Sequence, residues 1–200
     1  MQVSNFNFTH SEEEVISQQE FFLLKHAATK KIIDLFGSIE KGITSELNHH
    51  IIEVAGLNKT NGKIFRGENY KLFPYIVLDC PKLFSTSSIF AYRTMFWWGH
   101  EFSFTLHLQG AALEMFRKNI SERLDDLKGK GVYYCVNDTP WQYHFERDNY
   151  HLIENVKSID GEINSKPFLK LSRKVSVEEH AKVFDYAMET LQLFLDLLSV

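Results

Sequence analysis

The segment of residues 90–108 constrains the fold more than any other part of the chain, because two strand-like runs flank a single Gly-His pair. Aromatic and apolar residues fill the run before the pair, FAYRTMFWW, and apolar residues alternate with polar ones after it, in EFSFTLHL. Such runs joined by two residues are typical of a β-hairpin, and a leading glycine supplies the positive φ of a type II′ turn. We therefore predict an antiparallel hairpin with Gly99 and His100 at its turn.

This turn would pair Trp98 with Glu101 and divide the hairpin into two faces. The expected core face carries Arg93 and six apolar residues: Met95, Trp97, Phe102, Phe104, Leu106 and Leu108. The other face is amphipathic and carries Tyr92, Thr94, Phe96, Trp98, Glu101, Ser103, Thr105 and His107. This second face is either the solvent side of a sheet or the wall of a site in which polar groups orient an apolar ligand.

The N-terminal part of the chain has helical periodicity. Ser11 and Glu14 have the spacing of a capping box, which predicts a helix from residue 12 that ends at Gly37. A second helix is expected from Ser38, because an apolar residue recurs every four positions. That stripe consists of Ile39, Ile43, Leu47 and Ile51. We predict a helical hairpin within residues 11–56.

The rest of the chain alternates between strand-like and helical patterns. Within residues 63–108 we expect four strands, at 63–66, 74–79, 90–98 and 101–108. A helix is expected over 111–128, and further strands within 132–172, for which VYYCV and WQYHFE are candidates. The chain should end in a helix over 177–198. The last helix is apolar on more than one face, so we predict that Phe194 is buried against the N-terminal helices of the same chain. The alternative is a second subunit.

Together these elements predict one α+β domain over residues 1–200. Its antiparallel, hairpin-rich sheet would be covered on one face by helices, with an N-terminal helical hairpin and a long C-terminal helix. A chain of 200 residues is long enough to bury one core.

Composition narrows the classes of function. A net charge of −4 without a basic cluster argues against nucleic acid as a partner. The chain has no apolar run of membrane-spanning length and does not begin like a secretory signal, so we expect a soluble, cytoplasmic protein that is not bound to a membrane. Cys80 and Cys135 are too few for a disulfide framework and are expected to be buried thiols.

Four charged or titratable residues are candidates for chemistry. Arg66, in the segment RGENY, could bind a carboxylate or phosphate, although Gly-Glu-Asn is also typical of an ordinary turn. Arg93 falls on the expected core face, where a charge must be compensated, and Asp79 is its expected partner in a structural ion pair. His107 lies on the amphipathic face.

Metal and cofactor motifs are not recognisable. Glu46 and His49 have a Glu-x-x-His spacing, but no other expected helix supplies a matching pair. His144 and His151 flank FERDNY at a spacing that fits no standard ligand set. There is no nucleophile elbow, phosphate loop or dinucleotide fingerprint. We therefore predict no metal site and no cofactor.

Residues 64–120 contain RGENYKLFPYIVLD, then the hairpin, then a helix with Phe116, Arg117 and Ile120. This order resembles the middle of the YktB-like bacterial proteins, a family of unknown function. The resemblance implies an uncharacterised bacterial protein and brings no activity with it.

Three hypotheses of function follow, and the first is preferred. It is a small-molecule or peptide-binding domain that uses Arg66, Tyr92, Phe96, Trp98 and His107. The second is an enzyme of unknown reaction built around Arg66, Arg93, Asp79 and His107. The third is an assembly protein, for example a homodimer, that acts through its terminal helices.

Overall fold

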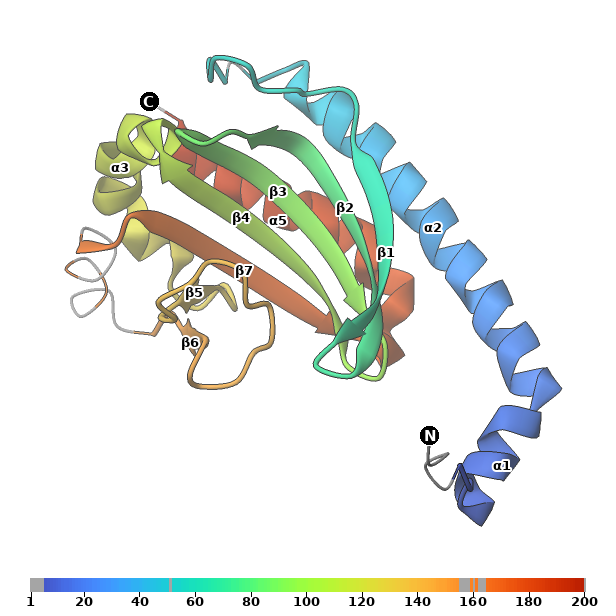
Figure 1. Ribbon diagram of the computed structural model, residues 1–200. Coiled ribbons are helices and arrows are strands. Elements are labelled where there is room, and N and C mark those ends of the chain that lie inside the picture. Colours follow the sequence, from blue (N-terminus) through green and yellow to red (C-terminus); the bar gives the residue numbers. More distant parts are fainter. Residues whose placement is uncertain (1–5, 51, 155–158, 160, 162–164, 200) are drawn as a thin grey trace.

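The protein folds around one seven-stranded antiparallel sheet that packs against helices (Figure 1). The computed structural model describes residues 6–50, 52–154, 159, 161 and 165–199. The strand order is β1-β2-β3-β4-β7-β5-β6. The strands are β1 Lys63–Tyr70, β2 Phe73–Phe84, β3 Ser88–Trp97, β4 Glu101–Gly110, β5 Tyr133–Cys135, β6 Tyr150–Leu152 and β7 Phe168–Ser176. The α+β class predicted from the sequence is confirmed.

Helices cover one face of the sheet. They are α1 His10–Ser17, α2 Gln19–Leu47, α3 Ala111–Arg123 and α5 Val183–Leu198, with short 3₁₀ helices η1 Leu124–Leu127 and η3 Val177–Lys182. Helix α5 crosses behind the central strands, and α2 runs along the β1–β2 side (Figure 1). The core lies between these helices and the sheet, whereas α1 and the first half of α2 extend beyond it. In the described parts of the chain, no helix combines the length and apolar character that a membrane span requires.

The connection between β3 and β4 is one residue longer than predicted. Phe96 pairs with Phe102, and the loop consists of Trp98, Gly99 and His100. The backbone N–H of His100 donates to the carbonyl of Trp97 at 3.0 Å, and Gly99 has a φ of 75° in the middle of the loop. The two-residue turn is therefore wrong. Because side chains alternate between faces, this shift exchanges the faces of β4 relative to β3.

The corrected register separates an apolar face from a mixed one. The helix-covered face combines Tyr92, Phe96, Phe102, Phe104, Leu106 and Leu108, all of which belong to the main core. The opposite face combines Arg93, Met95, Trp97, Ser103, Thr105 and His107. The helix-covered face of the hairpin is therefore more apolar than predicted, and each residue of β4 shares a face with different residues of β3 than predicted.

The N-terminal helices begin and end at other residues than predicted. Thr9, not Ser11, is the N-cap of α1, and its side chain forms a capping box with Glu12. Helix α2 continues through Gly37 and Ser38, so one long helix replaces the predicted hairpin. Gly37 costs about 1 kcal/mol inside a helix, and the burial of Phe36 and Ile39 on either side of it stabilises the helix. Ile51, the last residue of the predicted stripe, lies outside the described residues.

The C-terminal helix is buried within the same chain. Phe194 is 1% exposed, and its ring centroid lies 6.4 Å from that of Tyr92 on the sheet. Helix α5 also contacts α2, where a Cβ added at Gly42 would lie 2.9 Å from Sδ of Met188. The absence of a side chain at Gly42 is what allows the two helices to approach. The predicted burial of Phe194 is confirmed, but its ring contacts Tyr92 of the sheet, and the predicted contact with the N-terminal helices stays a prediction.

The second face of the sheet is covered by the chain between β5 and β6. The predicted strand WQYHFE is wrong, because residues 141–146 are irregular and fold back over β3, β4 and β7. Gln142 and Tyr143 contact Lys170 of β7, and Trp141 contacts His107 of β4. Polar side chains on this face are therefore enclosed.

Candidate functional site

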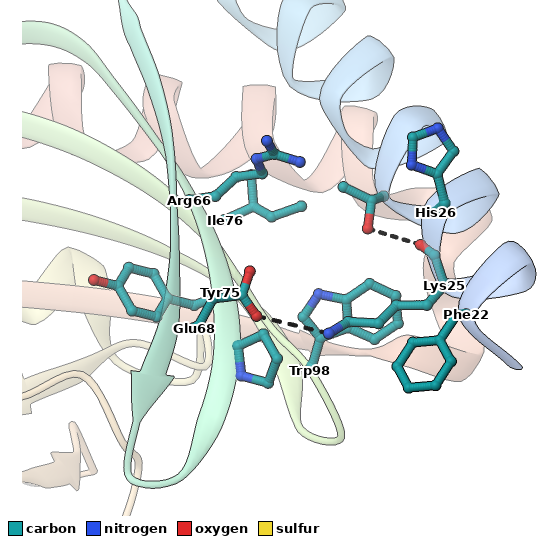
Figure 2. A pocket seen from close by; sticks show the side chains of 10 residues that line it. Phe22, Lys25, His26, Arg66, Glu68, Tyr75, Ile76 and Trp98 are labelled. Carbon is teal, nitrogen blue, oxygen red and sulfur yellow. Dashed lines mark hydrogen bonds and ion pairs between the residues drawn. The ribbon is translucent and has the colours of Figure 1, made fainter. Parts of the chain in front are cut away.

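A pocket of about 190 Å³ lies between the first half of α2 and the edge of the sheet (Figure 2). Helix α2 supplies one wall, strands β1 and β2 supply the other, and the β3–β4 loop contributes an indole ring. Its lining includes Phe22, Lys25, His26, Arg66, Glu68 and Trp98. Two of these six, Arg66 and Trp98, are predicted ligand-binding residues.

The charges of this pocket favour an anion. Nζ of Lys25 lies 3.7 Å from Oε2 of Glu68 and 5.9 Å from the centroid of the Trp98 ring. The guanidinium of Arg66 extends between β1 and α2 (Figure 2) and forms no ion pair or hydrogen bond with any described residue. Two permanent positive charges therefore face one carboxylate, which Lys25 already neutralises. Arg66, which is exposed, has no protein partner among the described residues.

Strand geometry explains why Arg66 and Glu68 share the pocket. They are two residues apart in β1, so both side chains lie on the face toward α2. Gly67, between them, faces the other way, where an added Cβ would clash with the Tyr75 ring unless that ring moved. The segment RGENY is thus part of a strand rather than a turn.

The structure does not bring the five predicted ligand-binding residues together. Tyr92 is 1% exposed and donates its hydroxyl to the carbonyl of Ala187 at 2.6 Å, which ties the sheet to α5. Phe96 is buried in the core beside Trp98, with ring centroids 5.1 Å apart. His107 lies on the opposite face of the sheet. Only Arg66 and Trp98 line the pocket.

Sequence reasoning missed the residues that α2 contributes to the pocket. The signal was the run Phe21-Phe22-Leu23-Leu24, followed directly by Lys25 and His26. Four consecutive apolar residues on a helix point in all directions, so no single core can bury them all. In the structure these four are between 48% and 70% exposed.

A second group of functional side chains is enclosed on the other face of the sheet. The predicted pair of Arg93 and Asp79 is present there, with Nε to Oδ1 at 2.7 Å and Nη2 to Oδ2 at 2.8 Å. The guanidinium carbon also lies 4.8 Å from the centroid of the Tyr143 ring. The pair is bidentate and shielded from solvent, which is the structural role expected of it.

Burial shifts the pKa values of this enclosed group. Lys170 is 0% exposed, and desolvation lowers its pKa to about 7, with Arg93 contributing in the same direction. Its Nζ donates to the carbonyl of Gln142 and lies 4.0 Å from the Tyr143 ring centroid. Desolvation likewise lowers the pKa of His107 to about 3, and Lys170 adds to this shift. Near pH 7 the Lys170 amine is therefore about half protonated, whereas the His107 imidazole is neutral.

This arrangement separates the residues of the enzyme hypothesis. Arg93, Asp79 and His107 lie on the enclosed face, but Arg66 lies on the helix-covered side of β1. Four residues divided between two faces of a sheet do not form one active site. The open pocket and the enclosed polar group are separate features.

Comparisons with known proteins add no assignment. No family model, curated protein or solved structure matches this chain.

Proposed function

We propose that the protein binds a small organic carboxylate with an aromatic or apolar group, in the pocket between α2 and the sheet. The observation that carries this proposal is the Arg66 guanidinium, which faces the pocket without a partner among the described residues. A guanidinium pairs with a carboxylate through two parallel hydrogen bonds. Trp98 and Phe22 supply the apolar surface for the rest of the ligand.

The dimensions of the pocket limit the ligand. Pockets for drug-sized molecules have volumes of about 300–1,000 Å³, so about 190 Å³ accommodates a single-ring acid or one residue of a peptide. The lining is also partly exposed at Phe22, which is 48% exposed. We therefore expect weak affinity, with a Kd on the order of 1 mM for a fragment.

Phenylacetate and its uncharged analogue phenylacetamide test this proposal by NMR titration. Phenylacetate should shift the indole N–H signal of Trp98, which Trp98→Phe identifies, and phenylacetamide should bind about five- to tenfold more weakly because it lacks the charge. Arg66→Gln should abolish this preference, whereas Arg147→Gln, at an exposed arginine outside the pocket, should preserve it. Equal binding of acid and amide by the wild type would refute the proposal.

A second candidate function, assembly of two copies of the chain, is favoured by the exposed apolar residues of the N-terminal helices. On α1 and the first half of α2, exposed residues are Val15, Ile16, Phe21, Phe22, Leu23 and Leu24. Several exposed apolar residues so close together in the chain favour an interaction site.

We propose a second copy of the chain as the occupant of this surface. Two-fold dimers are the commonest assembly, and they bring the same surface of each protomer together.

A further inference from the structure

The turn between Tyr143 and Tyr150 brings together three side chains of types that can bind a metal ion, those of His144, Glu146 and Asp148. Nδ1 of His144 lies 3.8 Å from Oε2 of Glu146 and 3.7 Å from Oδ1 of Asp148. One ligand atom from each of the three residues lies within 4.8 Å of the others. Metal–ligand bonds to these groups are about 2.0–2.2 Å long, so neighbouring ligand atoms of one ion are about 3.0–3.6 Å apart. The exposed carboxylates would therefore move by about 0.5–1.5 Å to complete the site.

His144 distinguishes this group from an ordinary cluster of surface acids. Its side chain is 3% exposed, yet Nδ1 has no hydrogen-bond partner among the described residues. Buried imidazole nitrogens are normally satisfied, so an unpartnered one that faces two carboxylates requires an explanation. A bound cation would supply the missing partner. From the sequence, His144 was considered only with His151 and no metal site was predicted, whereas the fold places it beside Glu146 and Asp148.

The backbone of this turn is held in place. Asn149 is fully buried, and its Nδ2 donates to the carbonyl of His144 at 2.6 Å, while its backbone N–H donates to the carbonyl of Glu146 at 3.0 Å. Asn137 donates to the carbonyl of Asp148 at 3.1 Å. Fixed backbone positions on either side of the ligands reduce the ordering that metal binding would require.

We propose that His144, Glu146 and Asp148 bind a divalent transition-metal ion. One imidazole nitrogen and two carboxylate oxygens suit Mn²⁺ or Zn²⁺, whereas Mg²⁺ prefers oxygen ligands alone. Three ligands from one turn leave the remaining coordination positions to water, so the site is open on its solvent side. Lys71 competes with the ion, because its Nζ lies 2.9 Å from Oε2 of Glu146.

Calorimetric titration of untagged, EDTA-treated protein with MnCl₂, ZnCl₂ and MgCl₂ tests the site. We expect one Mn²⁺ or Zn²⁺ ion per chain and weaker binding of Mg²⁺. Asp148→Asn and Glu146→Gln, both at exposed positions, should each weaken binding by at least about tenfold. Glu122→Gln, at an exposed carboxylate on α3, is the matched control and should bind like the wild type.

Two further measurements separate a built site from loosely held surface ions. Lys71→Gln removes the competing ammonium and should tighten Mn²⁺ binding several-fold. The electron spin-echo spectrum of bound Mn²⁺ should show coupling to one ¹⁴N nucleus from His144. The proposal is overturned if no saturable binding occurs, if both carboxamide variants bind like the wild type, or if the spectrum lacks nitrogen coupling.

Discussion

Lys170 is a charged residue type that the fold places fully out of contact with water. Its amine is fully buried between the sheet and the Gln142–Tyr143 backbone, and desolvation lowers its pKa from 10.5 to about 7. The unfolded chain therefore binds one more proton than the folded chain between about pH 7 and pH 10.5. The free energy of unfolding must rise with pH across this window, because protons bound only by the unfolded state stabilise that state.

Lys170→Met should remove this pH dependence. Between pH 7 and pH 8.5 one such group contributes at most about 1.4 kcal/mol per pH unit to the free energy of unfolding, and the variant should lose that slope. Urea melts at several pH values measure it, with Lys128→Met, at an exposed lysine, as the control that keeps the wild-type slope. The upper limit of pH 8.5 keeps the contribution of Cys80 small, because its thiol titrates near 9.0 in the unfolded chain and burial raises its pKa to about 11 in the folded one. An unchanged slope in Lys170→Met would show that Lys170 is protonated in the folded protein.

At the scale of elements, the β3–β4 hairpin places its two adjacent tryptophans in different environments. Trp97 is 5% exposed, stacks on His100 with centroids 3.5 Å apart, and donates Nε1–H to the carbonyl of Tyr70 at 3.2 Å. Trp98 is half-buried at the pocket. The first indole therefore connects the β3–β4 loop to the β1–β2 turn.

Trp97→Ala should destabilise the protein more than Trp98→Ala does. Truncating a buried aromatic side chain costs about 3–5 kcal/mol, and truncating a half-exposed one costs much less. Denaturant melts of the two variants give the comparison. Trp97→Phe, which keeps an aromatic ring but loses the N–H donor, should fall between wild type and Trp97→Ala. Equal losses for the two alanine variants would contradict the packing described for the hairpin.

The same hairpin shows what the sequence could and could not predict. Alternation located β3 and β4 to within two residues, because strand burial imposes a period of two. It could not fix their register, since large apolar residues occupy both faces of β3, such as Phe96 on one and Trp97 on the other. A three-residue loop and a two-residue turn can both contain Gly99, and only tertiary packing selects between them.

Helix α2 shows the opposite limitation. Local signals at Gly37 and Ser38 favour a helix end, but residues far away in the chain, including Met188 and Phe184 beside Gly42, stabilise the continuous helix. Contacts between distant parts of the chain also decide which residues line the pocket and which residues surround His144. Arg66 and Trp98 were predicted ligand-binding residues, but their neighbours depend on how α2 meets β1. His144 was considered with His151 alone, and no metal site was predicted from the sequence.

At the scale of the whole molecule, the projecting N-terminal helices should make the protein a dimer in solution. Light scattering over a wide concentration range should give twice the chain mass, and Leu23→Glu should give a folded monomer, because a charge on that surface opposes its burial. Leu23 is 70% exposed in the single chain, so its replacement leaves the core intact. Circular dichroism checks that the variant is folded.

The control for this prediction is Leu72→Glu. Leu72 is 86% exposed in the β1–β2 turn, far from the N-terminal helices in sequence, and its replacement should leave the dimer unchanged. A wild-type protein that is monomeric at every concentration would exclude assembly through α1 and α2, and would leave the carboxylate pocket as the remaining function of this region.

Because the first half of α2 projects beyond the core, ligand binding in the pocket and dimer formation through α2 should affect each other. Its first described buried residue is Phe36, so the turns before it contribute little to the core and can open locally at small free-energy cost. The pocket lies on one side of these turns, and the surface with Leu23 and Leu24 lies exposed on the helix. A carboxylate and a second protomer would each order the same helical segment. Whichever binds first carries the entropic cost of ordering the helix, so the other binds without that cost. Linkage then requires that each raises the affinity of the other by the same factor.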